Sequence, residues 1–512
     1  TPFDMRGVDL GHQGGDCSFE TILRRYDLTD PVPWRLAEIV HEAEAPSARP
    51  MPCRRESPGD LMTTESDDVS TPPSTRRPPP AEGAASSDVV PFGQAARAWF
   101  AISLQTFGGP AGQIAVMQRH LVDERRWIGQ RRFLHALNYC MLLPGPEAQQ
   151  LAIYVGWLLN GVRGGLVAGT LFVLPGAVAL LALSAVYVRF GDTTVVGALF
   201  TGLAPAVVAI VAQAVWRVGT RALTNPVLVG FAVAAFASLA VFGVPFPIVV
   251  AAAALVGWLL HRLRPQLVTA GDGHAGGGDG PQPLISDDAL HHDRPSARRA
   301  ATILLTGLAA WFLPVALVAA TTGTGSVFTQ QGLFFSGTAV VTFGGAYAVL
   351  AYVAQRAVEH YAWLSAGDMV RGLALAETTP GPLIMVVQFV AFLGGYHHPG
   401  TLNPWAAGLL ASALTTWVTF VPCFLFILLG APYVERLRGN HALSAALTGI
   451  TAAVVGVIAN LGLYFAVHTL FTTTRTVTTG PLHLQLPDPA TVRWVPVGIS
   501  LIAAVLIFRL RW

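Results

Sequence analysis

The sequence predicts an all-α polytopic membrane protein whose two homologous halves form an inverted repeat with broken or re-entrant helices. Three observations predict this fold class. The 512 residues are 52% hydrophobic and only 12% charged, which is too apolar for an ordinary soluble protein. The apolar residues gather into long runs, and a pair of motifs rich in glycine and proline occurs twice.

Apolar runs long enough to cross a membrane dominate the chain after residue 92. A helix needs about 20 apolar residues to cross a hydrocarbon core of roughly 30 Å, and we expect roughly 10–13 hydrophobic segments when broken ones are included. A large soluble helical core would need polar stripes, which these runs lack. Complete spans are predicted near residues 162–187, 194–216, 225–242, 245–262, 301–321, 404–430, 443–470 and 494–512.

Composition divides the chain into five parts. A polar segment, residues 1–45, precedes a stretch rich in Pro, Ser and Thr, residues 46–91, which indicates a disordered linker. The first membrane half, residues 92–264, is separated from the second, residues 300–512, by a Gly- and His-rich linker at 265–299. We expect no signal peptide, because no apolar stretch of that kind lies near the start.

Two short motifs occur in the same order in both halves. Thr106-Phe107-Gly108-Gly109 returns as Thr342-Phe343-Gly344-Gly345, and Pro144-Gly145-Pro146 returns as Pro380-Gly381-Pro382, each 236 positions later. We call these the TFGG and PGP motifs. Beyond an 11-residue insertion in the second half, Pro175 aligns with Pro422. Features that align at a constant spacing indicate an internal repeat.

The loops that follow the two TFGG motifs differ in charge. The first, residues 119–132, carries five arginines against two acidic residues, whereas the second, residues 356–368, carries one arginine against two. By the positive-inside rule, the first loop belongs in the cytoplasm and the second outside. Equivalent loops on opposite sides predict an inverted repeat, with the N-terminal segment in the cytoplasm.

The TFGG and PGP motifs are candidate substrate-binding elements. Proline supplies no N–H and glycine relaxes the φ restriction, so both interrupt a helix. Broken backbone at membrane depth is tolerated where it is buried or lines a polar cavity, and helix N-termini bind anions without a charged side chain. A plain proline kink is the alternative. The candidate residues are Gly108, Gly109, Pro110, Gln113, Pro144, Gly145, Pro146, Gln149, Gly344, Gly345, Thr378, Thr379, Pro380, Gly381 and Pro382.

Five ionisable residues near the motifs are candidates for coupling or gating. Glu147 and Glu377 flank the PGP motifs, and an ionisable group inside a membrane segment is a functional candidate. We expect either residue to be able to carry a coupling proton. For Glu147 the alternative is a position at the wet tip of a hairpin. Arg119, His120 and Arg356 are placed to attract an anion at the cavity mouth, or serve only as topogenic charge.

Several other functions are not supported by the sequence. The 32 basic residues are all arginine, so a phosphate-binding loop that ends in Gly-Lys is absent and ATP hydrolysis is not expected. The histidine pairs His291-His292 and His397-His398 lack spaced carboxylate partners. The four cysteines show no C-x-x-C spacing, so no metal site is predicted. We expect no cofactor and no nucleic-acid partner, while the lipid bilayer is the expected environment.

At these motifs the chain resembles the chromate transporter family in its long-chain, two-domain form. The resemblance lies in TFGGPAGQIAVMQRHLVDERRWIGQRRF, LLPGPEAQQLAIYVGW, GGLVAGTLFVLPGA and ALAETTPGPLIMVVQFVAF, and it covers residues 92–512. It implies export of chromate across the inner membrane, driven by the membrane potential or the proton gradient, with sulfate as a competing oxyanion. Residues 1–45 resemble part of the soluble chromate-resistance protein.

Two other functions remain open on the residues alone. A sulfate or other oxyanion carrier working inward is the first, because chromate and sulfate share shape and charge. A membrane-bound oxyanion sensor or enzyme is the second, although no nucleophile, base and orienting group occur together. The sequence leaves the oligomeric state open, a dimer included.

Overall fold

The computed structural model describes residues 89–107, 109–191, 193–264, 284–285, 296–343, 346–431, 441–479 and 482–510. The chain divides into two units, residues 1–80 and 81–512, and the described residues belong to the second. The predicted segment 1–45, almost all of both linkers, and the site candidates Gly108, Gly344 and Gly345 lie outside the described residues.

The predicted all-α class is confirmed. The helices of the first half are α3 (Phe92–Ser103), α4 (Gly109–Gln118), α5 (Gln130–Met141), α6 (Glu147–Phe190), α7 (Thr194–Ala222), α8 (Pro226–Ala240) and α9 (Phe246–Leu263), with a π-helical turn, η1 (Arg119–Glu124), after α4. Those of the second half are α10 (Ala297–Thr322), α11 (Val327–Val341), α12 (Ala346–Gln355), α13 (Ala366–Thr378), α14 (Val386–His397), α15 (Pro404–Gly430), α17 (His441–Leu470) and α18 (Trp494–Arg509). The second half also has short turns at η3 (Arg356–His360), η4 (Leu383–Met385) and η6 (Pro489–Thr491).

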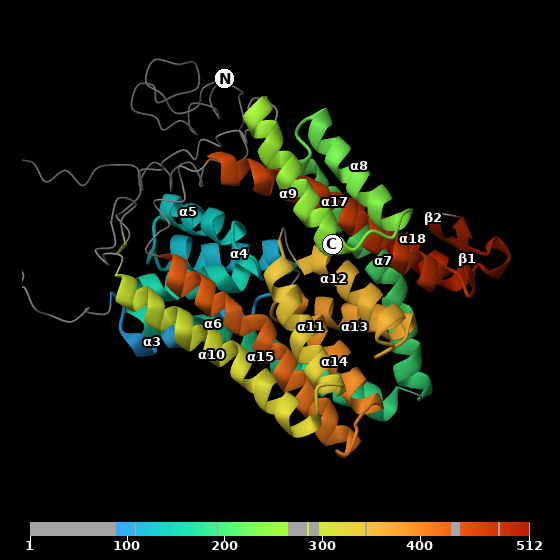
Figure 1. Cartoon of the computed structure of the whole chain (residues 1–512), viewed down its shortest axis with the longest axis horizontal. Helices are drawn as coiled ribbons and strands as arrows, with labels where there is room; N and C mark the ends of the chain where they lie inside the picture. The colour runs from blue at the N-terminus through green and yellow to red at the C-terminus, as the bar shows by residue number, and fades with distance from the viewer. Residues whose placement is uncertain are drawn as a thin grey trace, which may run out of the picture. The chain divides into compact units, whose positions relative to one another are not determined.

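One departure from the expected helices is an antiparallel hairpin between α17 and α18. Its strands, β1 (Thr474–Thr479) and β2 (Leu482–Pro487), pair from Thr474 with Pro487 to Thr479 with Leu482. Alternating Thr and apolar residues favour extended backbone over a helix here, so the segment between α17 and α18 contains a β-ribbon (Figure 1).

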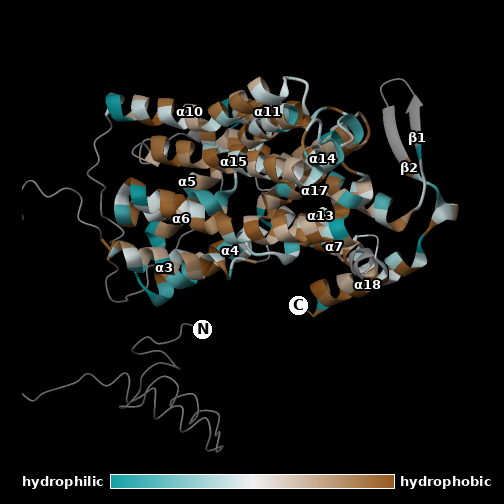
Figure 2. Cartoon of the chain, turned by 90° about the horizontal axis from the view of Figure 1, so that it is seen from below, coloured by the Kyte–Doolittle hydropathy of each residue, from teal (hydrophilic) through white to brown (hydrophobic). Residues whose placement is uncertain are grey.

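Six helices among the described residues are long and apolar enough to span a membrane, namely α6, most of α7, α9, α10, α15 and most of α17. Helix α10 exposes Leu305, Leu313 and Leu317 by 68%, 67% and 63%, and Figure 2 shows this helix at an outer edge with many hydrophobic residues. An apolar face of this length that is left uncovered by protein is typical of a lipid-facing helix. The chain is therefore a multi-pass membrane protein.

The two halves repeat one another down to their irregular features. Helices α3, α4 and α5 are matched 236 positions later by α11, α12 and α13, and a π-helical turn follows both α4 and α12. Arg126 and Ala362, at equivalent positions, both have positive φ, at 51° and 50°. Helix α6 is interrupted at Asn160 and Gly161, where the second half separates α14 from α15. The repeat predicted from sequence thus extends to the backbone.

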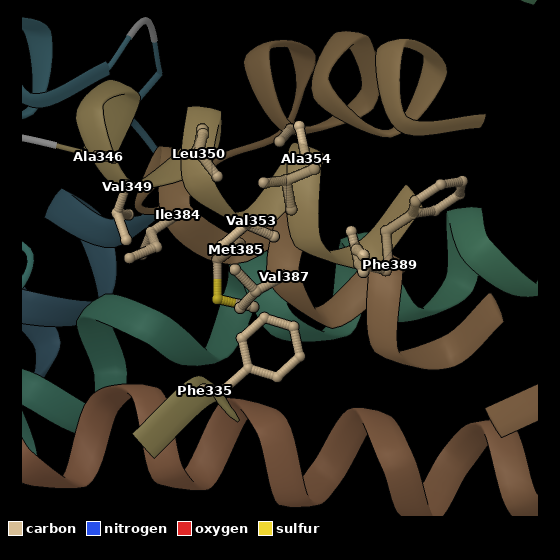
Figure 3. Close-up of a cluster of buried hydrophobic side chains, with 14 of the residues drawn as sticks. Phe335, Ala346, Val349, Leu350, Val353, Ala354, Ile384, Met385, Val387 and Phe389 are labelled. Carbon is tan, nitrogen blue, oxygen red and sulfur yellow. The ribbon is translucent and has the colours of Figure 1, made fainter. Parts of the chain in front are cut away.

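The core is shared between the halves. Helix α17 packs against α7, α8 and α9 of the first half, and α15 packs against α6, α10, α11 and α14 (Figure 1). The largest apolar cluster surrounds the second PGP motif, where Phe335, Met385 and Val387 point toward one another (Figure 3). This packing fixes the helix breaks between rigid helices of both halves.

Candidate functional site

The two PGP motifs are sharp breaks at which one helix ends and another begins. Gly145 has φ of 119° and Gly381 has φ of 103°, a region that residues with a Cβ rarely adopt. The flanking prolines have no N–H and cannot continue a helix. Glycine is therefore required at both positions, and the sequence prediction of broken helices is confirmed there.

Each PGP motif is held by the TFGG motif of the other half. The N–H of Gly145 donates to the carbonyl of Thr342 at 2.8 Å, and the N–H of Gly381 donates to the carbonyl of Thr106 at 2.9 Å. The side-chain amide of Gln113 on α4 donates to the carbonyl of Gly381 at 2.6 Å. Residues more than 190 positions apart are thus joined in two equivalent pairs.

Residues next to the prolines inside the two long helices complete this exchange. Gly176, next to Pro175 of α6, packs so closely on the carbonyl of Pro380 that an added Cβ would overlap it. At the repeat-equivalent position on α15 stands Cys423, whose Sγ lies 2.9 Å from where a Cβ on Gly145 would be. Each PGP motif therefore contacts the other half's long helix beside its internal proline.

Helix N-termini meet in pairs at these contacts. Helix α6 begins after Pro146 and η4 begins after Pro382, both without a side-chain cap. Helix α4 begins at Gly109, whose φ is 77°, and α12 begins just beyond the second TFGG motif. The first turn of a helix carries unpaired N–H groups and a partial positive charge. The hydrogen bonds between motifs join the residues just before α4 to those just before η4, and the residues just before α12 to those just before α6. Helix α4 also packs on α6, and α12 on η4.

Gln149 is the predicted site residue with the most unusual environment. Its side chain is fully buried in the first turns of α6, and neither its amide nitrogen nor its amide oxygen has a hydrogen-bond partner. The neighbouring Gln150 instead donates to the carbonyl of Pro144 at 2.7 Å. A buried amide without partners costs free energy, so Gln149 is suited to contact a ligand or water.

The predicted threonines before the second PGP motif are paired locally. The hydroxyl of Thr378 donates to the carbonyl of Leu375 at 3.0 Å, and that of Thr379 donates to the carbonyl of Ala376 at 3.2 Å. These bonds close the last turn of α13, whose terminal carbonyls would otherwise be unpaired. In this conformation both hydroxyls serve the helix end.

The two candidate carboxylates differ in their surroundings. Glu377 accepts a hydrogen bond from the hydroxyl of Tyr347 in the first turn of α12, and Arg217 of α7 is near enough to act on it electrostatically. Glu147 is half-buried at the first turn of α6. Tyr347 was not among the site residues predicted from sequence, although its position two residues after the second TFGG motif could have indicated it.

Arg119 and His120 belong to a charged cluster on η1. His120 Nδ1 lies 2.6 Å from Glu124 Oε2, and its Nε2 lies 3.2 Å from Gln105 Oε1. Arg119 donates to the same Gln105 oxygen at 3.0 Å. Within the cluster, Glu124 offsets part of the positive charge. The cluster adjoins the TFGG motif through Gln105.

Arg356 begins the equivalent turn, η3, in the second half. Its guanidinium carbon lies 5.6 Å from the centroid of the Tyr361 ring, a cation–π geometry, and its buried Nε has no hydrogen-bond partner. The aligned positions of His120 and Arg356 thus both lie on the π-helical turns, and Arg119 begins the first of these turns.

Within the described part of the chain, His, Cys, Asp and Glu form no group of three that is suited to a metal. A surface pocket of about 400 Å³ is lined by Val162, Ser296, Arg298, Arg299, Thr302 and Ile303. That pocket contains no residue of the TFGG or PGP motifs, whose polar groups are buried between helices.

The fold and the paired breaks define a multi-pass membrane transporter built from two repeats. Residues 93–258 and 329–512 match the family described as chromate transporter, and the chain belongs to this family. Residues 1–59 match the C-terminal domain of ChrB. No solved structure matches the chain.

Curated relatives agree with this assignment. The chain is 34% identical over 364 residues to the chromate transport protein of Pseudomonas aeruginosa, a match covering 69% of this chain and 76% of that protein. It is 29% identical over 352 residues to the chromate transport protein of Cupriavidus metallidurans, with coverage of 69% and 77%. A probable chromate transport protein of Synechococcus elongatus is 26% identical over 355 residues, with coverage of 69% and 79%.

Proposed function

We propose that this protein exports chromate across the cytoplasmic membrane and so confers resistance to it. The observation that carries the proposal is the exchange of hydrogen bonds between motifs, in which Gly145 bonds Thr342 and Gly381 bonds Thr106. It joins residues that precede helices of both halves at buried breaks. The names of the curated relatives supply the substrate.

Helix N-termini suit a dianion that must also be released. Unpaired N–H groups and the helix dipole attract negative charge, whereas a buried arginine would hold a dianion tightly. Beside the carboxyl groups Glu147 and Glu377, the breaks offer uncharged donors, with Gln113 bonded to Gly381 and Gln149 unpaired. Binding through neutral donors favours turnover over retention.

We infer that Glu377 couples transport to protons. It stands three residues before Pro380 and is hydrogen-bonded to Tyr347, so it touches α12 while it lies on α13. A change in its charge therefore acts on the contact between α12 and α13, the helix that ends just before the second PGP motif. Glu147 occupies the first turn of α6 beside the other break and is a second candidate for the same role.

The two halves are proposed to be inverted relative to the membrane, with residues 1–45 as a separate cytoplasmic segment. The N–H groups of Gly145 and Gly381 bond the equivalent carbonyls of Thr342 and Thr106, which is compatible with a two-fold relation between the halves. The loops at residues 119–132 and 356–368 differ in charge. Inverted repeats place substrate sites near the membrane midplane. The positive-inside rule then puts Arg125 in the cytoplasm and His360 outside.

Labelling of single cysteines tests the inversion. Arg125→Cys and His360→Cys, each in a variant whose four native cysteines are replaced by serine, should react with a membrane-impermeant thiol reagent from opposite sides. We expect the residue-360 variant to react in intact cells and the residue-125 variant to react in inside-out vesicles. Labelling of both from one side would exclude the inverted arrangement.

Uptake of labelled chromate by inside-out vesicles tests the function. Vesicles with the wild-type chain should accumulate chromate when energised, a protonophore should abolish the accumulation, and excess sulfate should compete. Gly381→Leu should abolish uptake at normal protein levels, whereas Gly230→Leu, at a glycine with open space around it, should not. Transport of sulfate without chromate would favour the alternative oxyanion carrier.

A further inference from the structure

Three threonine hydroxyls on α15 lack the hydrogen bond that threonine ordinarily makes in an apolar helix. In such helices the hydroxyl donates to a carbonyl one turn earlier, as Thr306 does to Thr302 at 2.7 Å and Thr451 does to Leu447 at 2.9 Å. The hydroxyls of Thr415, Thr416 and Thr419 are buried and have no partner.

Thr415 and Thr419 are the most deeply buried of these threonines. Thr415 is fully buried and Thr419 is 1% exposed, and their spacing of four residues places them on one face of α15. An unpaired buried hydroxyl is costly, whereas an apolar group of the same shape would not be. Two such groups in succession therefore indicate partners other than the helix itself.

Packing contacts locate the face that carries these hydroxyls. One turn after Thr419, Cys423 meets Gly145 of the first PGP motif. One turn before Thr415, Ala411 packs against Gly395 of α14. The hydroxyls therefore lie on the stripe of α15 that runs from α14 to the N-terminus of α6.

The fold itself does not require hydroxyls at these positions. In the repeat, Thr415 and Thr419 align with Ala168 and Phe172 of α6, which are both fully buried apolar residues. The same structural role is thus filled without a polar group in the first half. The hydroxyls occur in the second half only, which is compatible with a site for a single ligand.

We propose that Thr415 and Thr419, together with Gln149 of α6, bind a tetrahedral oxyanion through uncharged donors. Gln149 adds a buried amide with no partner, one turn beyond Gly145. The inference rests on the proposed transport function and names the side chains that select its substrate. Two hydroxyls and an amide donate to oxygens that diverge in space, which a tetrahedral oxyanion supplies and a halide does not.

Isosteric replacement separates a ligand role from a structural one. Thr415→Val and Thr419→Val keep the side-chain shape and remove the hydroxyl. Each purified variant should unfold at the same temperature as the wild type or higher without ligand, because an unpaired polar group has been removed. The stabilisation by added chromate, sulfate or molybdate should fall, and the KM for transport should rise about tenfold or more, since a hydrogen bond to a charged group is lost.

Thr451→Val is the matched control, because its hydroxyl is bonded within α17. It should leave the KM unchanged. Thr415→Val and Thr419→Val that unfold at a lower temperature and keep the wild-type KM would overturn the proposal. If the wild type binds sulfate or molybdate but not chromate, the proposed function fails while the oxyanion site stands. If the wild type binds no tetrahedral oxyanion, both fail.

Discussion

Gly176 illustrates how a single residue is constrained by the other half of the chain. It lies in the middle of α6, where alanine would ordinarily be the better helix former. A Cβ at this position would overlap the carbonyl of Pro380, so glycine is kept for the sake of the second PGP motif. Glycine lowers the helix propensity at this position, but it allows the backbone of α6 to approach the backbone of Pro380.

Gly176→Ala should therefore abolish chromate transport while the protein still inserts into the membrane. The added methyl group displaces the PGP motif, and the gain in helix propensity, about 1 kcal/mol, cannot offset the overlap. Gly230→Ala on α8, with nothing within 4 Å, is the control and should transport normally. Wild-type uptake by vesicles carrying Gly176→Ala would show that the contact is not needed.

The hydrogen bond from Tyr347 to Glu377 gives a second prediction at the scale of residues. Tyr347→Phe removes a donor that stabilises the ionised carboxylate, so the carboxyl group binds its proton more readily. The optimum of proton-coupled chromate transport should shift to higher pH, and Glu377→Gln should lose the pH dependence together with most of the transport. A pH profile of uptake measures both. Identical profiles for wild type and Tyr347→Phe would remove Glu377 from the coupling step.

At the scale of elements, the turns after η1 and η3 show a feature imposed by the fold. Arg126 and Ala362 both adopt positive φ near 50°, although neither is glycine. The strain recurs at equivalent positions, and the N–H groups of Trp127 and Trp363 bond carbonyls six residues earlier in both turns. The tight return from a π-helical turn into α5 or α13 accounts for it.

Ala362→Gly should accordingly stabilise the protein by about 1 kcal/mol, because glycine adopts positive φ without a steric cost. Thermal unfolding of the purified protein measures this. Ala354→Gly, at a buried helical position of α12, is the matched control and should destabilise. A loss of stability in both variants would mean that the φ of Ala362 carries no strain.

The sequence predicted the elements well and the contacts between them poorly. The span expected at residues 404–430 is the observed α15, and the repeat and its breaks follow from glycine and proline. Hydrogen bonds between TFGG and PGP join residues distant in sequence, which local pattern cannot reveal. The unpaired Thr415 was missed because threonine in an apolar run usually bonds its own helix. The β1–β2 hairpin was not predicted, although the residues of both strands alternate in the way that is typical of β-strands.

At the scale of the whole molecule, neither half is complete alone. Each PGP motif is bonded by the TFGG motif of the opposite half, and helix α17 of the second half packs against three helices of the first. The largest apolar cluster includes Leu180 and Val207 from the first half beside Val454 and Phe465 from the second. The membrane part therefore has to assemble from both halves.

Two polypeptides, residues 1–275 and 276–512, should restore chromate transport when they are expressed together and should fail when expressed singly. The cut falls in the linker at 265–299, and the contacts between motifs do not depend on that connection. Copurification of the two pieces and vesicle uptake measure the outcome. Activity of either piece alone would show that one set of breaks suffices.

Contacts between the halves also constrain which substitutions the protein tolerates. Gly381 contacts Gly176, and Gly145 contacts Cys423. After a duplication, the two copies would not have been free to diverge independently, since the complement of each motif is encoded in the other copy. Compensatory substitutions for a lesion in one half should therefore be selected in the opposite half. The two copies are therefore expected to evolve together rather than independently.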